Sequence, residues 1–256
     1  MDKNIHFKTL VFFLLVLGIL SGNSALGQVD GGYPGNVAKI NLLGLPLRNF
    51  SVQYERLIAR KTSLGLGVAV LPRGSFPMLN SFESLIDDEE TFRQLQDIRV
   101  GSTSVTLEPR IYFGKQDGAR GFYIAPYVRY NTYALDFDQF DYEVTLDGWT
   151  YDRWIPLEGN VHSFTGGVMF GAQWRIARHV YLDWWMVGAA YGVASGSLKG
   201  TTALTAEEQY GLGYALNELE IPMVETTVEV DAGGARLGLK GPWAGVRTGL
   251  SIGVAF

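Results

Sequence analysis

The side chains with the clearest capacity for chemistry are charged residues spaced so that they share one face with small and hydroxyl-bearing neighbours. Charges withdrawn from water must pair with opposite charges or be neutralised. Such a set can line a gated ion path or form a plug of buried salt bridges, and a narrow interior that is filled by side chains favours the plug. The predicted interior set is Lys39, Glu55, Glu108, Arg110, Arg129, Arg175, Asp183 and Arg247.

A histidine beside a serine, His162 and Ser163, with Glu158 nearby, suggests ester hydrolysis by a nucleophile and a general base. Strand-like alternation, however, points His162 and Ser163 to opposite faces, which prevents a shared proton relay. The alternative is a strand-end histidine at a membrane interface. We therefore predict no catalytic residues.

Metal and cofactor motifs are absent from the sequence. Three acidic residues, Asp136, Asp138 and Asp141, could approach a calcium ion, but they lack the glycine-centred twelve-residue loop that calcium sites use. No phosphate loop, dinucleotide fingerprint or HExxH zinc motif is present. The chain has no cysteine, which excludes disulfides and thiolate ligands. We predict neither a metal nor a cofactor.

The elements that must position the charged residues follow from alternation of period two, which recurs in pieces of about 9–11 residues, the length of a tilted transmembrane strand. Four pieces are well marked and four are weaker. Together they predict eight strands at Val37–Gly44, Asn49–Ile58, Ser63–Leu71, Ser104–Phe113, Phe122–Tyr133, Ser163–Ile176, Val180–Gly192 and Val246–Phe256.

The connections between these strands fall into two classes. Short turns alternate with three long segments, about 72–102, 134–161 and 193–243, and the first connection, through Pro46, is short. An even number of strands with short turns at one end and mostly long loops at the other is typical of bacterial outer-membrane barrels. We predict an all-β, eight-stranded antiparallel up-and-down transmembrane barrel with periplasmic turns and extracellular loops.

The choice of interior face separates a membrane barrel from a soluble one, which would place its apolar face inward. In Val246–Phe256 one face is bulky and apolar, and the other is small or charged. An eight-stranded interior is too narrow for a ring of large apolar side chains from every strand, so we place the apolar face outward. Pro109 and Pro126 are irregular in this assignment, since proline is rare in central strands.

Composition and the N-terminus agree with an exported protein. The chain has 256 residues, 18% of them charged, and a net charge of −5, which argues against disorder, coiled coil and a nucleic-acid partner. Lys3 and Lys8 precede an apolar run at 10–20 and then small residues. This pattern predicts a cleavable signal peptide at 1–27 and a barrel domain at 28–256.

The three long segments hold most of the 26 acidic residues, whereas the short turns are basic. Residues 81–97 have a helix-like apolar pattern around an acidic centre. Thr205 with Glu208 is a capping box, which predicts the start of a helix. We interpret these segments either as a folded extracellular cap that binds a protein partner or a surface glycolipid, or as a solvated acidic surface without a ligand.

The signal peptide, the eight strands and the terminal run together resemble small eight-stranded OmpA-like outer-membrane barrels of Gram-negative bacteria, including families known only as domains of unknown function. The resemblance covers the whole mature chain. It implies that the terminal run is read by the barrel-assembly machinery, and that outer-membrane lipid and lipopolysaccharide surround the protein. The peptidoglycan-binding domain of full-length OmpA-type proteins has no counterpart here. The terminal run consists of Leu250, Ile252, Val254 and Phe256.

The fold alone names no activity, because it hosts adhesins, enzymes and narrow channels. We expect a non-enzymatic outer-membrane protein with a structural or surface-interaction role in its acidic loops, alone or as a subunit of a larger outer-membrane complex. One alternative is a porin-like narrow channel or transporter for small or hydrophobic solutes. The other is a lipid-A-modifying enzyme, although the His-x-Ser-Asn spacing of lipid-A deacylases is missing.

Overall fold

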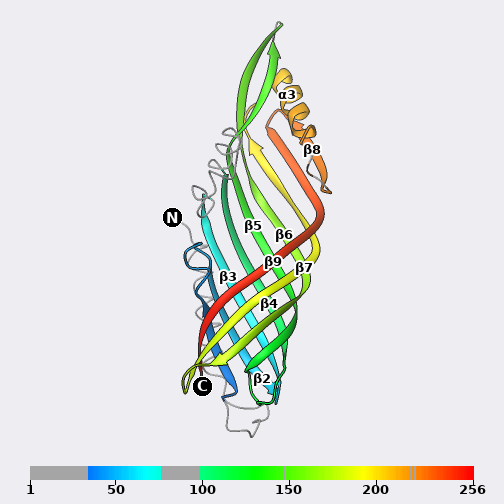
Figure 1. Cartoon of the computed structure of the whole chain (residues 1–256). Helices are drawn as coiled ribbons and strands as arrows, with labels where there is room; N and C mark the ends of the chain where they lie inside the picture. The colour runs from blue at the N-terminus through cyan, green and yellow to red at the C-terminus, as the bar shows by residue number, and fades with distance from the viewer. Residues whose placement is uncertain (1–33, 76–97, 147, 220, 222) are drawn as a thin grey trace.

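The computed structural model describes residues 34–75, 98–146, 148–219, 221 and 223–256, and within them the protein is an elongated all-β molecule with one helix (Figure 1). Nine antiparallel strands form one sheet in the order β1-β2-β3-β4-β5-β6-β7-β9-β8, and pairing of β1 with β9 closes it into a ring. The elements are β1 (Asn36–Asn41), β2 (Phe50–Ala59), β3 (Thr62–Ser75), β4 (Ile98–Tyr112), β5 (Gly121–Leu146), β6 (Trp149–Arg175), β7 (Val180–Thr201), α3 (Ala206–Asn217), β8 (Glu225–Asp231) and β9 (Gly234–Ala255).

The prediction of a closed antiparallel sheet is confirmed, but the number of strands and the long loops differ from it. The eight predicted strands are β1 to β7 and β9, and β8 is an additional strand that pairs with the beginning of β9. Residues 134–146 and 149–161, predicted as one long loop, continue the paired strands β5 and β6 up to Leu146 and Trp149, with one register shift between Phe137 and Phe140. The predicted helix at 81–97 and the signal peptide lie outside the described residues.

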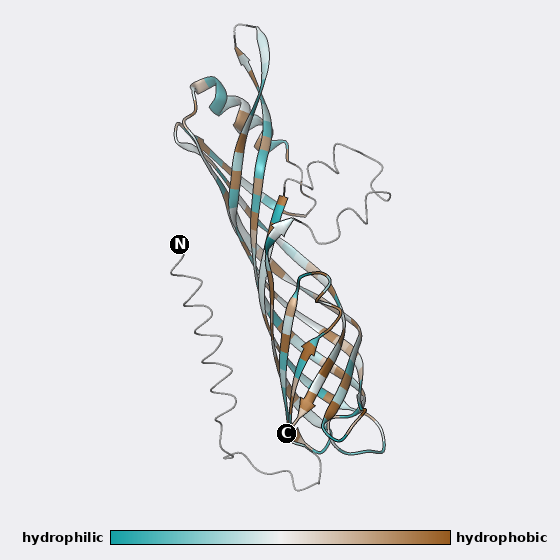
Figure 2. Cartoon of the chain, turned by 90° about the vertical axis from the view of Figure 1, so that its left-hand side faces the viewer, coloured by the Kyte–Doolittle hydropathy of each residue, from teal (hydrophilic) through white to brown (hydrophobic). Residues whose placement is uncertain are grey.

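The loop prediction failed because the polarity of the two sheet faces reverses along the strands. In the part of the sheet that closes through β1 and β9, here called the lower half, the outer face is apolar and the inner face polar. Beyond it, in the upper half, the inner face is apolar and the outer face polar. On β6, for example, Phe164 and Val168 are exposed below, whereas Ile155 and Leu157 are buried above. Figure 2 shows the resulting mixture of hydrophobic and hydrophilic residues along the strands of both halves.

The reversal occurs along one register row that crosses five strands. Cα pairing joins Thr103 to Thr132, Thr132 to His162, His162 to Ser195 and Ser195 to Lys240. These outward side chains are all polar, and we call them the polar row. Next to the row on the lower side stand Tyr130, Phe164 and Val193, each about half exposed or more.

The upper half has its own apolar core, closed by α3. The helix packs on β5, β8 and β9 and buries Leu212 and Leu216 completely (Figure 1). Its N-terminus has the predicted capping box. The Thr205 hydroxyl accepts a hydrogen bond from the Glu208 main-chain amide, and the Glu208 carboxylate accepts one from the Thr205 main-chain amide. Burial, reinforced by the Glu208 carboxylate, raises the pKa of Tyr142 in this core. The remaining buried members include Val144, Ile155, Leu157, Leu198, Ala235 and Leu237.

The two irregular prolines have a common place in the lower half. Leu107 pairs with Val128 and Ile111 with Ile124, so Pro109 and Pro126 come opposite each other in a gap in the β4–β5 ladder. Proline has no N–H to donate, and placing two together confines the lost hydrogen bonds to one site. Among the described residues, no helix is long and apolar enough to cross a membrane.

Candidate functional site

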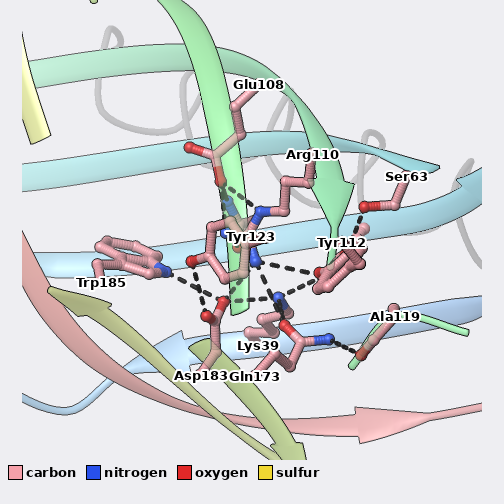
Figure 3. Close-up of polar contacts among 12 residues, drawn as sticks. Lys39, Ser63, Glu108, Arg110, Tyr112, Ala119, Tyr123, Gln173, Asp183 and Trp185 are labelled. Atoms are coloured by element: carbon pink, nitrogen blue, oxygen red, sulfur yellow. Dashed lines mark hydrogen bonds and ion pairs between the residues drawn. The ribbon is translucent and has the colours of Figure 1, made fainter. Parts of the chain in front are cut away.

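The interior of the lower half holds a cluster of ion pairs around Arg110 (Figure 3). The Arg110 side chain is fully buried, and its Nη1 lies 2.7 Å from Oδ2 of Asp183. Its Nε donates to Oε1 of Glu108 at 2.8 Å, and its Nη2 donates to Oε1 of Gln53 at 2.9 Å. Its Nη1 lies 3.5 Å from Oε2 of Glu55. One guanidinium from β4 therefore ties together β2, β4 and β7.

Lys39 on β1 connects the same acids to the strand that closes the ring. Its ammonium lies 2.7 Å from Oδ2 of Asp183 and also contacts Glu55 and the Gln173 side-chain oxygen. Because β1 is short, this buried ion pair adds a side-chain link across the closure that the backbone ladder makes with β9.

Neutral donors complete the coordination of the carboxylates. Asp183 accepts the Tyr123 hydroxyl at 2.8 Å and the Trp185 indole N–H at 3.0 Å. Glu55 accepts the hydroxyls of Ser63 and Tyr112. These partners matter because a buried carboxylate that lacks hydrogen bonds is strongly destabilising.

A second ion pair lies next to this cluster. Arg247 on β9 binds Glu108, and its guanidinium carbon lies 4.1 Å from the centre of the Trp185 ring. The cluster therefore contains three cations (Lys39, Arg110, Arg247) and three carboxylates (Glu55, Glu108, Asp183), all almost fully buried. The formal charges of these six residues cancel, as expected of side chains that fill an interior.

Six of the eight predicted interior charges belong to this charge cluster, and two do not. Arg129 is partly buried and donates from Nε to the Thr106 hydroxyl at 2.9 Å, with no ion pair among the described residues. Arg175 lies at the exposed end of β6 and donates to the main-chain oxygens of Ala177 and Arg178. Both arginines lie on the inward-facing positions of their strands, as predicted. Their positions along the strands, however, are too far from the carboxylates for an ion pair.

Sequence reasoning named only charged residues and missed the neutral members of the cluster. The omitted partners lie on the same alternating, inward-facing positions as the charged residues, and the sequence shows this alternation. Their contribution depends on which side chains lie at the same height across strands, which the alternation does not give. They are Gln53, Ser63, Tyr112, Tyr123, Gln173 and Trp185.

The candidate hydrolase residues are not brought together. His162 is exposed and its Nδ1 lies 3.0 Å from the Tyr130 hydroxyl, whereas Ser163 is 1% exposed and accepts a hydrogen bond from Asn131 inside the sheet. The predicted opposite orientation is confirmed, and no proton relay joins the two residues.

Two of the three aspartates considered as calcium ligands form ion pairs with arginines. Asp136 pairs with Arg73 at 3.1 Å, and Asp138 pairs with Arg99 at 2.9 Å. Within the described part of the chain, no group of three histidine or acidic residues is arranged to hold a metal ion.

An apolar cavity of about 340 Å³ lies inside the sheet where the two halves meet. Val100, Tyr133, Val161 and Ala194 contribute inward side chains from four strands, and Trp243 from β9 lies with its ring 5.2 Å from that of Tyr133. The other lining residues are Leu135, Ile221, Val224, Leu239, Lys240, Gly241 and Pro242. The cavity has the size of small-molecule sites, which span about 300–1,000 Å³.

A polar groove of about 720 Å³ lies on the outer face of the upper half, directly beyond the polar row. Its charged side chains are of both signs, with Glu158 and Glu229 beside Lys199 and Arg236, and His162 stands at one end. The mixture favours no particular ion.

The terminal run lies on the outer face at the end of β9. Ile252, Val254 and Phe256 are 40%, 57% and 54% exposed on the outer face, with Leu250 partly exposed in the same row. The strand that carries them pairs with β1 and β7 at the closure of the ring.

No family model, no curated protein and no solved structure matches this chain.

Proposed function

We propose that this protein is an outer-membrane β-barrel of a Gram-negative bacterium, non-enzymatic and closed to ions, whose lower half crosses the membrane and presents the upper half at the cell surface. The observation that carries the proposal is the reversal of polarity along single strands. An apolar outer face with a polar interior suits a lipid environment, and the opposite arrangement suits water.

The height of the apolar outer surface supports a membrane span. On β6 it runs from Phe164 to Trp174, about 34 Å along a strand at 3.4 Å per residue. With a strand tilt of about 45°, this length gives a band roughly 24 Å tall, close to the 25 Å apolar band of outer-membrane barrels. Trp174 and Trp184, whose rings stack with centroids 6.5 Å apart, lie near its lower end, where aromatic girdles are expected.

The charge cluster supports a structural interior. Its three cations and three carboxylates are paired with each other, and an eight-stranded barrel is just wide enough to be filled by side chains. We therefore expect no steady ion conduction through the lower half.

The upper half supports a surface-interaction role, because it is folded around its own core and still exposes large aromatic side chains. At the β5–β6 tip, Trp149 and Trp154 are 72% and 56% exposed. On α3, Tyr210 and Tyr214 are 79% and 59% exposed and, four residues apart, share one helix face. Exposed tryptophan and tyrosine are enriched at protein interfaces.

Two measurements test the proposal. Purified protein in detergent micelles should migrate faster on a gel before boiling than after it and give a β-rich circular dichroism spectrum. Reconstituted in a planar bilayer, it should show no conductance steps. A fold that is stable without detergent would refute the membrane assignment, and regular steps altered by a substitution at Arg110 would refute the closed interior.

A further inference from the structure

We infer that the apolar cavity between the two halves binds one unbranched hydrocarbon chain, which enters sideways through the wall beside β9. The inference goes beyond the proposed function and rests on it, because the membrane assignment places the cavity at the level of a bilayer surface. The chemistry is shared by a free fatty acid and by an acyl chain of a membrane lipid.

The lining of the cavity selects an apolar ligand. Val161, Ala194 and Leu239 form its wall, and the rings of Tyr133 and Trp243 pack together beside them. An unoccupied apolar cavity forfeits packing contacts, and one of about 150 Å³ is already large enough to take up benzene. At about 340 Å³ this cavity has room for a longer chain.

Among the described residues, both ends of the interior are filled, which leaves a hydrocarbon chain no axial route. Towards the lower end the charge cluster occupies the interior, with Arg247 and Glu108 paired on the side nearest the cavity. Towards the upper end the core around Leu212 and Leu216 is completely buried. Entry must therefore be lateral.

The lateral route is a break in the pairing of β9. On the edge away from β7, β9 pairs with β8 as far as Lys240 and with β1 from Ser251, and the Leu42 amide bonds the Leu250 oxygen. Among the described residues, Gly241–Gly249 has no strand partner on this edge.

The residues along this break fit an opening in the wall. Pro242 has no N–H, so it loses nothing at an unpaired edge. Gly245 has the parity of an inward residue yet is exposed, and a Cβ placed on it would meet nothing within 4 Å. Val246 is 82% exposed. The break contains Trp243, which lines the cavity. It lies on the lower side of Lys240, a member of the polar row, and the outer surface becomes apolar there.

The test uses the full mature chain in detergent micelles with dodecanoate brominated at its terminal carbon, because bromine quenches tryptophan fluorescence on contact. Trp174 and Trp184 on the apolar outer surface should give quenching that rises steadily with the probe in every variant. A saturable component is expected in addition, and this component should be lost in Trp243→Phe, which keeps an apolar ring. Ala194→Leu fills the cavity with about the volume of three methylene groups and should weaken binding at least about tenfold. Ala189→Leu makes the same change on the exposed outer face of β7 and should bind like the wild type.

Two further arms identify the source of the chain. Non-brominated dodecanoate and a diacyl phospholipid are added separately as competitors. Reversal of the saturable quenching at a lower concentration of dodecanoate indicates a free fatty acid, and reversal at a lower concentration of the phospholipid indicates a membrane lipid chain. The inference would be overturned if the wild type showed no saturable component, or if the saturable component in Trp243→Phe or Ala194→Leu equalled that of the wild type. The gel-mobility and conductance tests use no ligand, so a membrane barrel that binds no chain is distinguished from a protein that is not a membrane barrel.

Discussion

Replacing Arg110 by leucine is the most direct test of the charge cluster. The substitution keeps part of the side-chain volume but leaves three buried carboxylates, Glu55, Glu108 and Asp183, facing only two cations. Removing one partner of a buried ion pair costs about 3–5 kcal/mol of unfolding free energy. We expect a loss in this range, measured by urea unfolding in detergent micelles with tryptophan fluorescence as the signal.

A second substitution tests the reason for that loss. Glu55→Gln retains a side chain that can bond Ser63 and Tyr112, and in the wild type it should destabilise the protein because it breaks contacts with Lys39 and Arg110. In the Arg110→Leu background it restores charge balance and leaves Lys39–Asp183 and Arg247–Glu108 paired. There we expect Glu55→Gln to recover about 1–2 kcal/mol, within the range of coupling between neighbouring sites.

Arg175→Leu is the matched control, since Arg175 is exposed and bonds only main-chain oxygens at its own turn. Its unfolding free energy should stay within about 1 kcal/mol of the wild type. The explanation would be refuted if Arg110→Leu were as stable as Arg175→Leu, or if Glu55→Gln destabilised both backgrounds equally. If Arg110→Leu does not fold, the refolding yield of the double variant gives the same comparison.

Three other predictions address the two halves separately. Val168→Lys, in the middle of the apolar outer surface of β6, should lower the unfolding free energy in lipid vesicles by about 2–4 kcal/mol. Asn160→Lys, above the polar row on the same strand, should lower it by almost nothing. Equal effects of the two substitutions in urea unfolding would contradict the membrane assignment. Gly211→Ala should destabilise α3 although alanine has the better helix propensity, because a Cβ at this position overlaps the main-chain oxygen of Glu143. Gly213→Ala, whose Cβ would have its nearest neighbour at 3.8 Å, should stabilise α3 by up to about 1 kcal/mol. Hydrogen exchange of the helix amides measures both effects, and a more stable helix in Gly211→Ala would contradict the packing. Thr205→Ala should remove the helix cap and cost about 1 kcal/mol, seen as faster exchange in α3 with unchanged protection in the lower half, and uniform loss of protection would argue against separate cores.

The upper half shows why the sequence pattern did not predict the full length of β5 and β6. Along β5, outward positions change from Val128 and Tyr130 to Asp141 and Glu143, while inward positions change from Asn131 to Tyr142 and Val144. Read with the polarity of the lower half, these stretches look like acidic loops. The alternation of polar and apolar residues continues, apart from a register shift between Phe137 and Phe140. The sequence therefore indicated a longer strand, but with the apolar residues on the inner face and the polar residues on the outer face.

The sequence by itself determined the local geometry of this protein. Period two determined which side chains of each predicted strand share a face, because successive residues of a strand must point to opposite sides. The Thr205–Glu208 pair likewise fixed the start of α3, because a capping box acts within one turn.

Only the tertiary structure decided which of those residues meet. Lys39, Glu55, Arg110 and Asp183 come from four strands, and their contact depends on register and on closure of the ring by β1 and β9. Arg175 has the same parity and stays outside the cluster because it lies too near the end of its strand. The apolar cavity has the same origin, since it exists only where two oppositely polarised halves join beside the unpaired edge of β9. Alternation carries no information on height between strands, and hydrogen bonding across the sheet supplies it.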